Sequence, residues 1–166
     1  MHFIIQRINR FSELLGHLLA WLTLVMALLL LTVVALRYVF EIGSIALQES
    51  VLYLHGAILL LGAGFTLKHD AHVRVDVFYR GFSKHQQAWV NLLGNLLFLL
   101  PVTVFIGAVS WEYVWVSWQR LEGSAEAGGL PLVFIQKSLI LAFVVTFTLQ
   151  AIAQLMISIG AIKGDD

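Results

Sequence analysis

The chain has 166 residues, 60% of them hydrophobic and 12% charged, and its mean hydropathy is +0.88. Such a chain cannot cover a soluble surface with polar side chains, so the composition excludes an ordinary soluble domain and predicts a membrane protein. A formal net charge of zero argues against nucleic acid as a partner, and the absence of cysteine excludes disulfides, thiolate catalysis and cysteine metal ligands.

The apolar run that begins at Leu14 predicts a first membrane-spanning helix over about residues 14–37, because about 20 residues of helix cross a hydrocarbon core. This run is longer than the core of a secretory signal and has no small-x-small cleavage site, so we expect a retained helix. A second helix is predicted over about residues 45–68, with Ser44 as its N-cap. Gly62 within it would allow another helix to approach closely.

The segment from Lys68 to Gln87 is the most polar part of the chain. Its apolar residues at helical spacing are Val75, Phe78 and Phe82. This spacing predicts a short amphipathic stretch in the plane of the membrane interface. Ser83 then begins a capping-box pattern that opens a third helix over about residues 84–118. That helix is longer than a bilayer requires, so it should tilt, project from the membrane or bend at Pro101.

A glycine-rich loop follows, and Pro131 suits the first turn of a fourth helix over about residues 131–162. Seven Lys and Arg fall on the side of the two termini and the middle connection, against three on the other side. The positive-inside rule therefore predicts cytoplasmic N- and C-termini in an all-α integral membrane protein with four transmembrane helices. An aromatic belt is expected at the outer end of the third helix, formed by Trp111, Tyr113, Trp115 and Trp118.

Two histidines and two aspartates cluster just after the second helix, in residues 68–76. One interpretation is a metal site, since His69 and His72 share a helix face and aspartate oxygens lie nearby. The alternatives are a solvated loop held by ion pairs, and a structural motif in which Arg74 or Asp76 caps helix ends and docks a neighbour. We do not expect a metal in this chain.

Glu49 lies near the outer end of the second helix, where an ionised carboxylate facing lipid costs a few kcal/mol. It could relay protons or bind a cation. The simpler interpretation, which we favour, is a residue at the level of the lipid headgroups that pairs with a basic group on this chain or on a partner.

His17 and His55 raise the alternative of a haem held between helices by two histidines. The predicted topology places His17 near the cytoplasmic end of the first helix and His55 in the outer half of the second. One iron would struggle to reach both side chains. A haem-binding membrane-anchor subunit of an oxidoreductase is therefore the second choice of function.

Polar residues spaced by four form stripes on the third and fourth helices. Such stripes usually join helices through hydrogen bonds worth about 1 kcal/mol each, and less often line a permeation path. We expect joining from these residues: Asn91, Asn95, Thr146, Gln150 and Gln154. The chain has no internal repeat and no intramembrane charge cluster, so a complete transporter is not expected, and no grouped nucleophile and base indicate an enzyme.

A more specific pattern begins with an acidic residue opening the second helix, continues with small residues inside it and ends with the signature His, aliphatic, any, Val, Asp. The residues at the positions of this pattern are Gln48, Glu49, Gly62, Ala63, Lys68, His72, Val73, Arg74, Val75 and Asp76. This pattern resembles the small membrane subunit of tripartite ATP-independent periplasmic (TRAP) transporters, the DctQ-like family. Gln48 departs from it, because the family often has a second acidic residue there, so a paired-carboxylate role is not expected.

The resemblance implies a small scaffold subunit of a sodium-coupled transporter that imports a small organic acid, a carboxylate or sulfonate, across the bacterial inner (cytoplasmic) membrane. Its implied partners are the large elevator-type membrane subunit (DctM-like) and a periplasmic substrate-binding protein. Sodium and substrate would bind the large subunit, so no cofactor is expected in this chain. A third alternative is a small transporter built as an oligomer of this chain.

Overall fold

The computed structural model describes residues 2–73 and 77–164. The described residues form helices and their connections, without a strand, and four helical stretches are long and apolar enough to cross a membrane. These stretches are α1 (His2–Val39), α2 (Ile45–Lys68), the continuous Lys84–Gln119 and α5 (Val133–Lys163). The prediction of an all-α protein with four helices of membrane-spanning length is confirmed.

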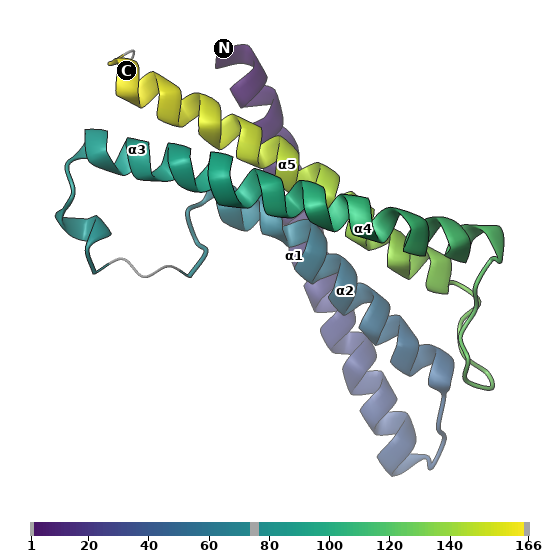
Figure 1. Cartoon of the computed structure of the whole chain (residues 1–166). Helices are drawn as coiled ribbons and strands as arrows, with labels where there is room; N and C mark the ends of the chain where they lie inside the picture. The colour runs from purple at the N-terminus through teal and green to yellow at the C-terminus, as the bar shows by residue number, and fades with distance from the viewer. Residues whose placement is uncertain (1, 74–76, 165–166) are drawn as a thin grey trace.

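Two antiparallel hairpins cross each other in the bundle (Figure 1). One consists of α1 and α2, and the other pairs α5 with the long stretch before it. The last helix, α5, packs against every other long helix. Both ends of the chain and residues 69–73 and 77–83 lie at one end, which we call the terminal end (Figure 1). Residues 40–44 and 120–132 lie at the opposite end, the loop end (Figure 1).

Helix α1 begins at His2 rather than near Leu14, where the apolar run starts. The extra turns are stabilised by packing, because Ser12 in the added part is buried to 3% exposure against α5. Hydrophobic length alone therefore underestimates this helix.

Helix α2 covers the predicted residues, and the Ser44 side chain accepts a hydrogen bond from the Leu47 N–H as an N-cap. At the other end Asp70 adopts a left-handed conformation with φ 54°. The Ala71 N–H then reaches back to the carbonyl of Thr66 at 3.0 Å and closes the last turn.

The connection after α2 contains only a short 3₁₀ turn, η1 (Tyr79–Gly81), rather than a longer regular helix in its described part. Phe78 is 76% exposed and Phe82 40% exposed, whereas Val75 lies outside the described residues. Placement of this segment at the membrane interface stays a prediction. Ser83 forms the predicted capping box with Gln86.

The long third stretch comprises α3 (Lys84–Gly94), a π-helical turn η2 (Asn95–Leu99) and α4 (Leu100–Gln119). The π turn ends two residues before Pro101, which has no N–H to donate and whose ring disturbs the turn before it. Widening that turn accommodates the proline, so α3 and α4 run on as one rod in Figure 1.

Helix α5 begins at Val133, so Pro131 precedes the helix and does not occupy its first turn as predicted. Pro131 instead packs in the loop, where a Cβ on Gly123 would lie 3.3 Å from the Pro131 Cα. The helix ends at Lys163, followed by Gly164 in a left-handed conformation with φ 75°.

Candidate functional site

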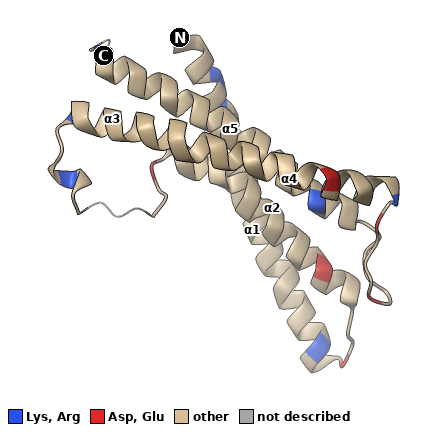
Figure 2. Ribbon diagram, in the orientation of Figure 1, with Lys and Arg blue, Asp and Glu red and all other residues tan. Residues whose placement is uncertain are grey.

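Charged residues lie near the ends of the helices and leave long uncharged middles (Figure 2). They form two main groups of contacts, besides an ion pair between Lys137 and Glu122. We call the contacts of Glu49 with residues 124–130 the loop junction, and those of Glu13 with residues 68 and 69 the terminal junction. Both join segments far apart in the sequence.

In the loop junction the carboxylate of Glu49 receives two hydrogen bonds. Glu49 Oε2 accepts from the backbone N–H of Leu130 at 2.6 Å, and Oε1 accepts from the hydroxyl of Ser124. The Ser124 N–H in turn donates to the Leu130 carbonyl at 2.9 Å, which closes the loop around the carboxylate. The partners of Glu49 are thus neutral donors of this chain. The favoured interpretation from the sequence had been a basic group.

Gly129 allows the loop to close this tightly. A Cβ at this position would overlap Ser124 Oγ and lie 2.9 Å from Glu49 Oε1. Ser124, Gly129 and Leu130 were not predicted from the sequence as neighbours of Glu49. The glycine-rich composition of the loop was the available signal, because glycine permits close approach of a backbone to another group.

A second contact at the loop end joins Lys137 to Glu122, with Lys137 Nζ 2.6 Å from Glu122 Oε2. The same ammonium lies 4.0 Å from the centre of the Tyr113 ring, a cation–π distance. The hydrogen bond from Lys137 lowers the pKa of the Glu122 carboxyl below its ordinary value. This ion pair fixes the start of α5 against the end of α4.

The four aromatic residues of the predicted belt are all exposed near the loop end of α4. Trp118 also donates its Nε1–H to the hydroxyl of Ser138 at 2.7 Å and packs edge-on against Phe134 at 4.7 Å. The exposed positions of these residues suit an aromatic belt, whose contact with lipid stays a prediction.

In the terminal junction Glu13 of α1 accepts from Lys68 Nζ, and His69 Nε2 lies 3.2 Å from the same carboxylate oxygen. The Lys68 side chain is only 21% exposed. The His69 ring also packs against Phe65 at 4.4 Å. These contacts join the first and second helices where the connection to α3 begins.

The signature histidine, His72, turns back onto the bundle. Its Nε2 lies 3.3 Å from the carbonyl oxygen of Ala63, and its ring meets Phe147 of α5 edge-on at 5.8 Å. His72 and His69 therefore contact different partners, and within the described residues no group of three metal-binding side chains forms. Arg74 and Asp76 lie outside the described residues.

The two glutamines of the α5 stripe join helices. Gln150 accepts from the Ser12 hydroxyl at 2.7 Å and donates to Asn9 Oδ1 at 3.0 Å. Gln154 Nε2 donates to the Leu67 carbonyl at 3.3 Å. Thr146 behaves differently, because its hydroxyl bonds to carbonyls of its own helix.

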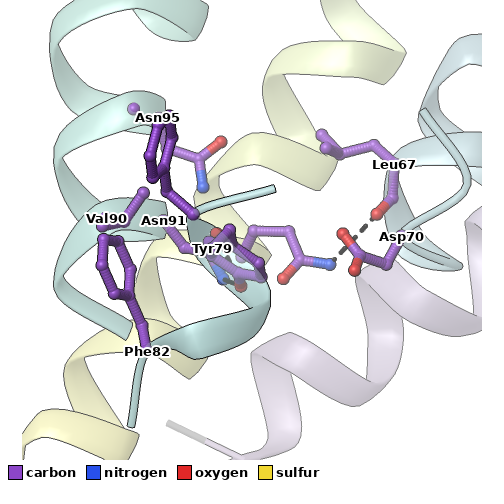
Figure 3. A pocket seen from close by; sticks show the side chains of 10 residues that line it. Leu67, Asp70, Tyr79, Phe82, Val90, Asn91 and Asn95 are labelled. Atoms are coloured by element: carbon purple, nitrogen blue, oxygen red, sulfur yellow. Dashed lines mark hydrogen bonds between the residues drawn. The ribbon is translucent and has the colours of Figure 1, made fainter. Parts of the chain in front are cut away.

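The asparagines of α3 and η2 face a pocket of about 410 Å³ between the end of α2, η1, α3 and α5 (Figure 3). Asn91 exchanges hydrogen bonds with the Tyr79 hydroxyl at 2.9 and 3.2 Å. Asn95 lines the pocket, and no side-chain hydrogen bond to it occurs among the described residues. Leu67 and Asp70 lie on the other side of the pocket (Figure 3).

Four further residues named in the sequence analysis are Gln48, Gly62, His17 and His55. Gln48 shares a small hollow with the end of α1, and a Cβ on Gly62 would meet Leu19 at an ordinary 3.8 Å. Both histidines of the haem alternative have exposed side chains, and His17 Nδ1 lies 2.8 Å from the Glu13 carbonyl of its own helix. Neither observation supports a haem held between these helices.

The fold and these contacts define a small multi-pass membrane protein whose polar side chains mostly join its own helices. The family model of the DctQ component of tripartite ATP-independent periplasmic transporters matches residues 26–159, and the chain belongs to this family. It is therefore a small subunit of a TRAP transporter, a transport component rather than an enzyme. No curated protein matches the chain. Nor does any solved structure.

Proposed function

We propose that this chain is the scaffold subunit of a sodium-coupled TRAP transporter that imports a small carboxylate or sulfonate across the bacterial inner membrane. The observation that carries the proposal is the pair of hydrogen bonds that join the fully buried side chain of Gln150 to Ser12 and Asn9 of α1. Polar groups within the membrane-spanning helices thus hold the bundle together, as a rigid scaffold requires.

The proposed partners are the large elevator-type subunit (DctM-like) and the periplasmic binding protein. Sodium and substrate bind the large subunit in this proposal, and this chain carries no cofactor. The excess of Lys and Arg near the terminal end supports cytoplasmic termini, so the loop end faces the periplasm. The Glu49 loop junction is then on the side where the binding protein arrives.

The signature residues Arg74 and Asp76 are proposed to fix the position of the large subunit or of the connection next to it. The family pattern, together with the packing of the adjacent His72 onto α2 and α5, supports this role. Substitution of Arg74 or Asp76 should weaken assembly or transport, while the binding protein still captures its substrate.

Reconstituted uptake tests the proposed function. The ligand of the cognate binding protein is first identified by thermal shift against a panel of carboxylates and sulfonates. Proteoliposomes with both membrane subunits should accumulate this ligand when the binding protein and a sodium gradient are supplied, and should not do so without this chain. Uptake that persists without this chain, or that this chain performs alone, would contradict the proposal.

A further inference from the structure

A cleft of about 590 Å³ opens beside α4 and the start of α5 at the loop end. We call it the Glu112 cleft. Its lining includes Glu112, Tyr113, Val116, Arg120, Glu122 and Lys137. Glu112, Val116 and Arg120 are spaced by four and therefore share one face of α4. Charged positions of both signs gather in this part of the bundle (Figure 2).

A different face of α4 is apolar. Trp111, Trp115 and Trp118 line a separate hollow of about 240 Å³, whose lining is aromatic and aliphatic apart from Ser138. The buried side chain of Val114 helps to line that hollow. Helix α4 thus presents one charged surface, which suits a polar partner, and one aromatic surface, which suits lipid or an apolar helix.

Within the Glu112 cleft, the charge of Lys137 is already compensated. Its ammonium binds Glu122 at 2.6 Å and lies over the Tyr113 ring. Glu112 differs, because its side chain is exposed and no hydrogen bond or ion pair to it occurs in the described part of the chain. The cleft therefore contains a carboxylate without a counter-charge.

The missing counter-charge matters because Glu112 lies well inside the end of α4. At 1.5 Å per residue, Glu112 lies about 10 Å inside the end of α4 at Gln119. It is level with Trp111, the innermost residue of the predicted aromatic belt. An ionised carboxylate at this level is unfavourable against lipid unless a basic group or water compensates it. Arg120 is about 12 Å away along the helix and cannot serve as that group.

We propose that a transmembrane helix of the large subunit docks in the Glu112 cleft and places a Lys or Arg side chain against Glu112. This inference rests on the proposed function and assigns its interface. Charge complementarity carries it, since the cleft is lined by the exposed Glu112 carboxylate, which has no counter-charge in the described part of the chain, and by Arg120 two turns further toward the end of α4. The partner helix accordingly carries a basic group at the depth of Glu112 and an acceptor near its end.

Photocrosslinking tests which face of α4 contacts the partner. Benzoyl-phenylalanine replaces Val116 inside the cleft or, as a matched control, Trp115 on the aromatic face of α4, and this chain is co-expressed with a tagged large subunit. Position 116 should crosslink to the large subunit at least several times more strongly than position 115. Crosslinking to a second copy of this chain, to the binding protein or to lipid alone would overturn the inference.

Recovery of the complex provides the second measurement. Glu112→Gln should reduce co-purification of this chain with the large subunit about tenfold, because loss of one partner of a desolvated charge pair is costly. Glu126→Gln, in the loop, is the control and should leave recovery unchanged. The isolated Glu112→Gln chain should melt like the unmodified chain, since no hydrogen bond or ion pair to Glu112 occurs among the described residues.

The outcomes separate the two proposals. If the unmodified chain is recovered with the large subunit and Glu112→Gln is recovered equally well, the cleft is not the interface and the proposed function stands. If the unmodified chain is not recovered at all, both proposals fail.

Discussion

The hydroxyl of Ser12 donates a 2.7 Å hydrogen bond to the amide oxygen of Gln150, 138 positions later in the chain. The amide nitrogen of Gln150 is used as well, because it donates to Asn9. The first and last long helices are thus joined by a side chain with no exposed surface. This pair joins α1 to the middle of α5.

Gln150→Leu should destabilise the isolated chain, because it removes both hydrogen bonds and leaves Ser12 and Asn9 without their partner. The expected cost is about 1–2 kcal/mol, as for interhelical hydrogen bonds in other membrane proteins. Thermal unfolding in mild detergent measures it. Thr146→Val on the same helix is the matched control and should cost less, because the Thr146 hydroxyl bonds only within α5. Equal losses would contradict a joining role for Gln150.

Glu49→Ala should release the loop that precedes α5. The substitution removes a charge-assisted bond to the Leu130 N–H, and such bonds contribute about 1.5–3 kcal/mol. Hydrogen exchange at Leu130 should therefore become at least about tenfold faster. Glu126→Ala in the same loop should leave that rate unchanged. Unaltered exchange in Glu49→Ala would show that the loop is held by other contacts.

Gly16→Ala should separate α1 from α2. A Cβ at this position would overlap the ring of Phe65, which already packs against His69. Overpacking of this kind costs about 1–3 kcal/mol. Gly160→Ala is the matched control, since among the described residues no atom beyond its own helix backbone and chain neighbours lies within 4 Å of the Cβ it would introduce. Because alanine has a higher helix propensity than glycine, Gly160→Ala should not lower the melting temperature. An equal fall in both variants would show that the contact with Phe65 is not the cause.

Stability should depend on pH through Glu122. Because Lys137 lowers the pKa of Glu122 from its ordinary value of 4.5, the ionised carboxyl is favoured in the folded state. This contribution is present above pH 4.5 and is lost as the pH falls from there through the lower folded-state pKa. Melting curves of the unmodified chain and of Glu122→Gln should differ at pH 7 and converge in more acidic buffer. A difference in melting temperature that grows on acidification would contradict the stabilising role of the ionised Glu122 carboxyl.

Local patterns predicted the helices well, because their signals lie within a few residues. Ser44 and the Ser83–Gln86 box mark two helix starts, and both caps form as predicted. The start of α1 was missed because its first turns are stabilised by Gln150, a residue of another helix. Pro131 was misplaced because its packing against Gly123 competes with its preference for a first helical turn.

The contacts of the polar residues were less predictable. Spacing on α5 shows that Thr146, Gln150 and Gln154 share a face, but it cannot show which side chain bonds back to its own helix. Glu49 was singled out from its place on the second helix, but its donors lie in a loop more than seventy residues later and could not be read from that place. Glu112 was overlooked, since its lack of a counter-charge becomes visible only when Lys137 is seen bound to Glu122.

Co-purification of this chain with a candidate large TRAP membrane subunit is the most direct test of the central claim. A tag on this chain, expressed with the untagged large subunit and extracted in mild detergent, should recover the two proteins together as a complex that persists through size-exclusion chromatography. Recovery of this chain alone, while the large subunit is present and folded in the same membranes, would contradict its role as the scaffold subunit.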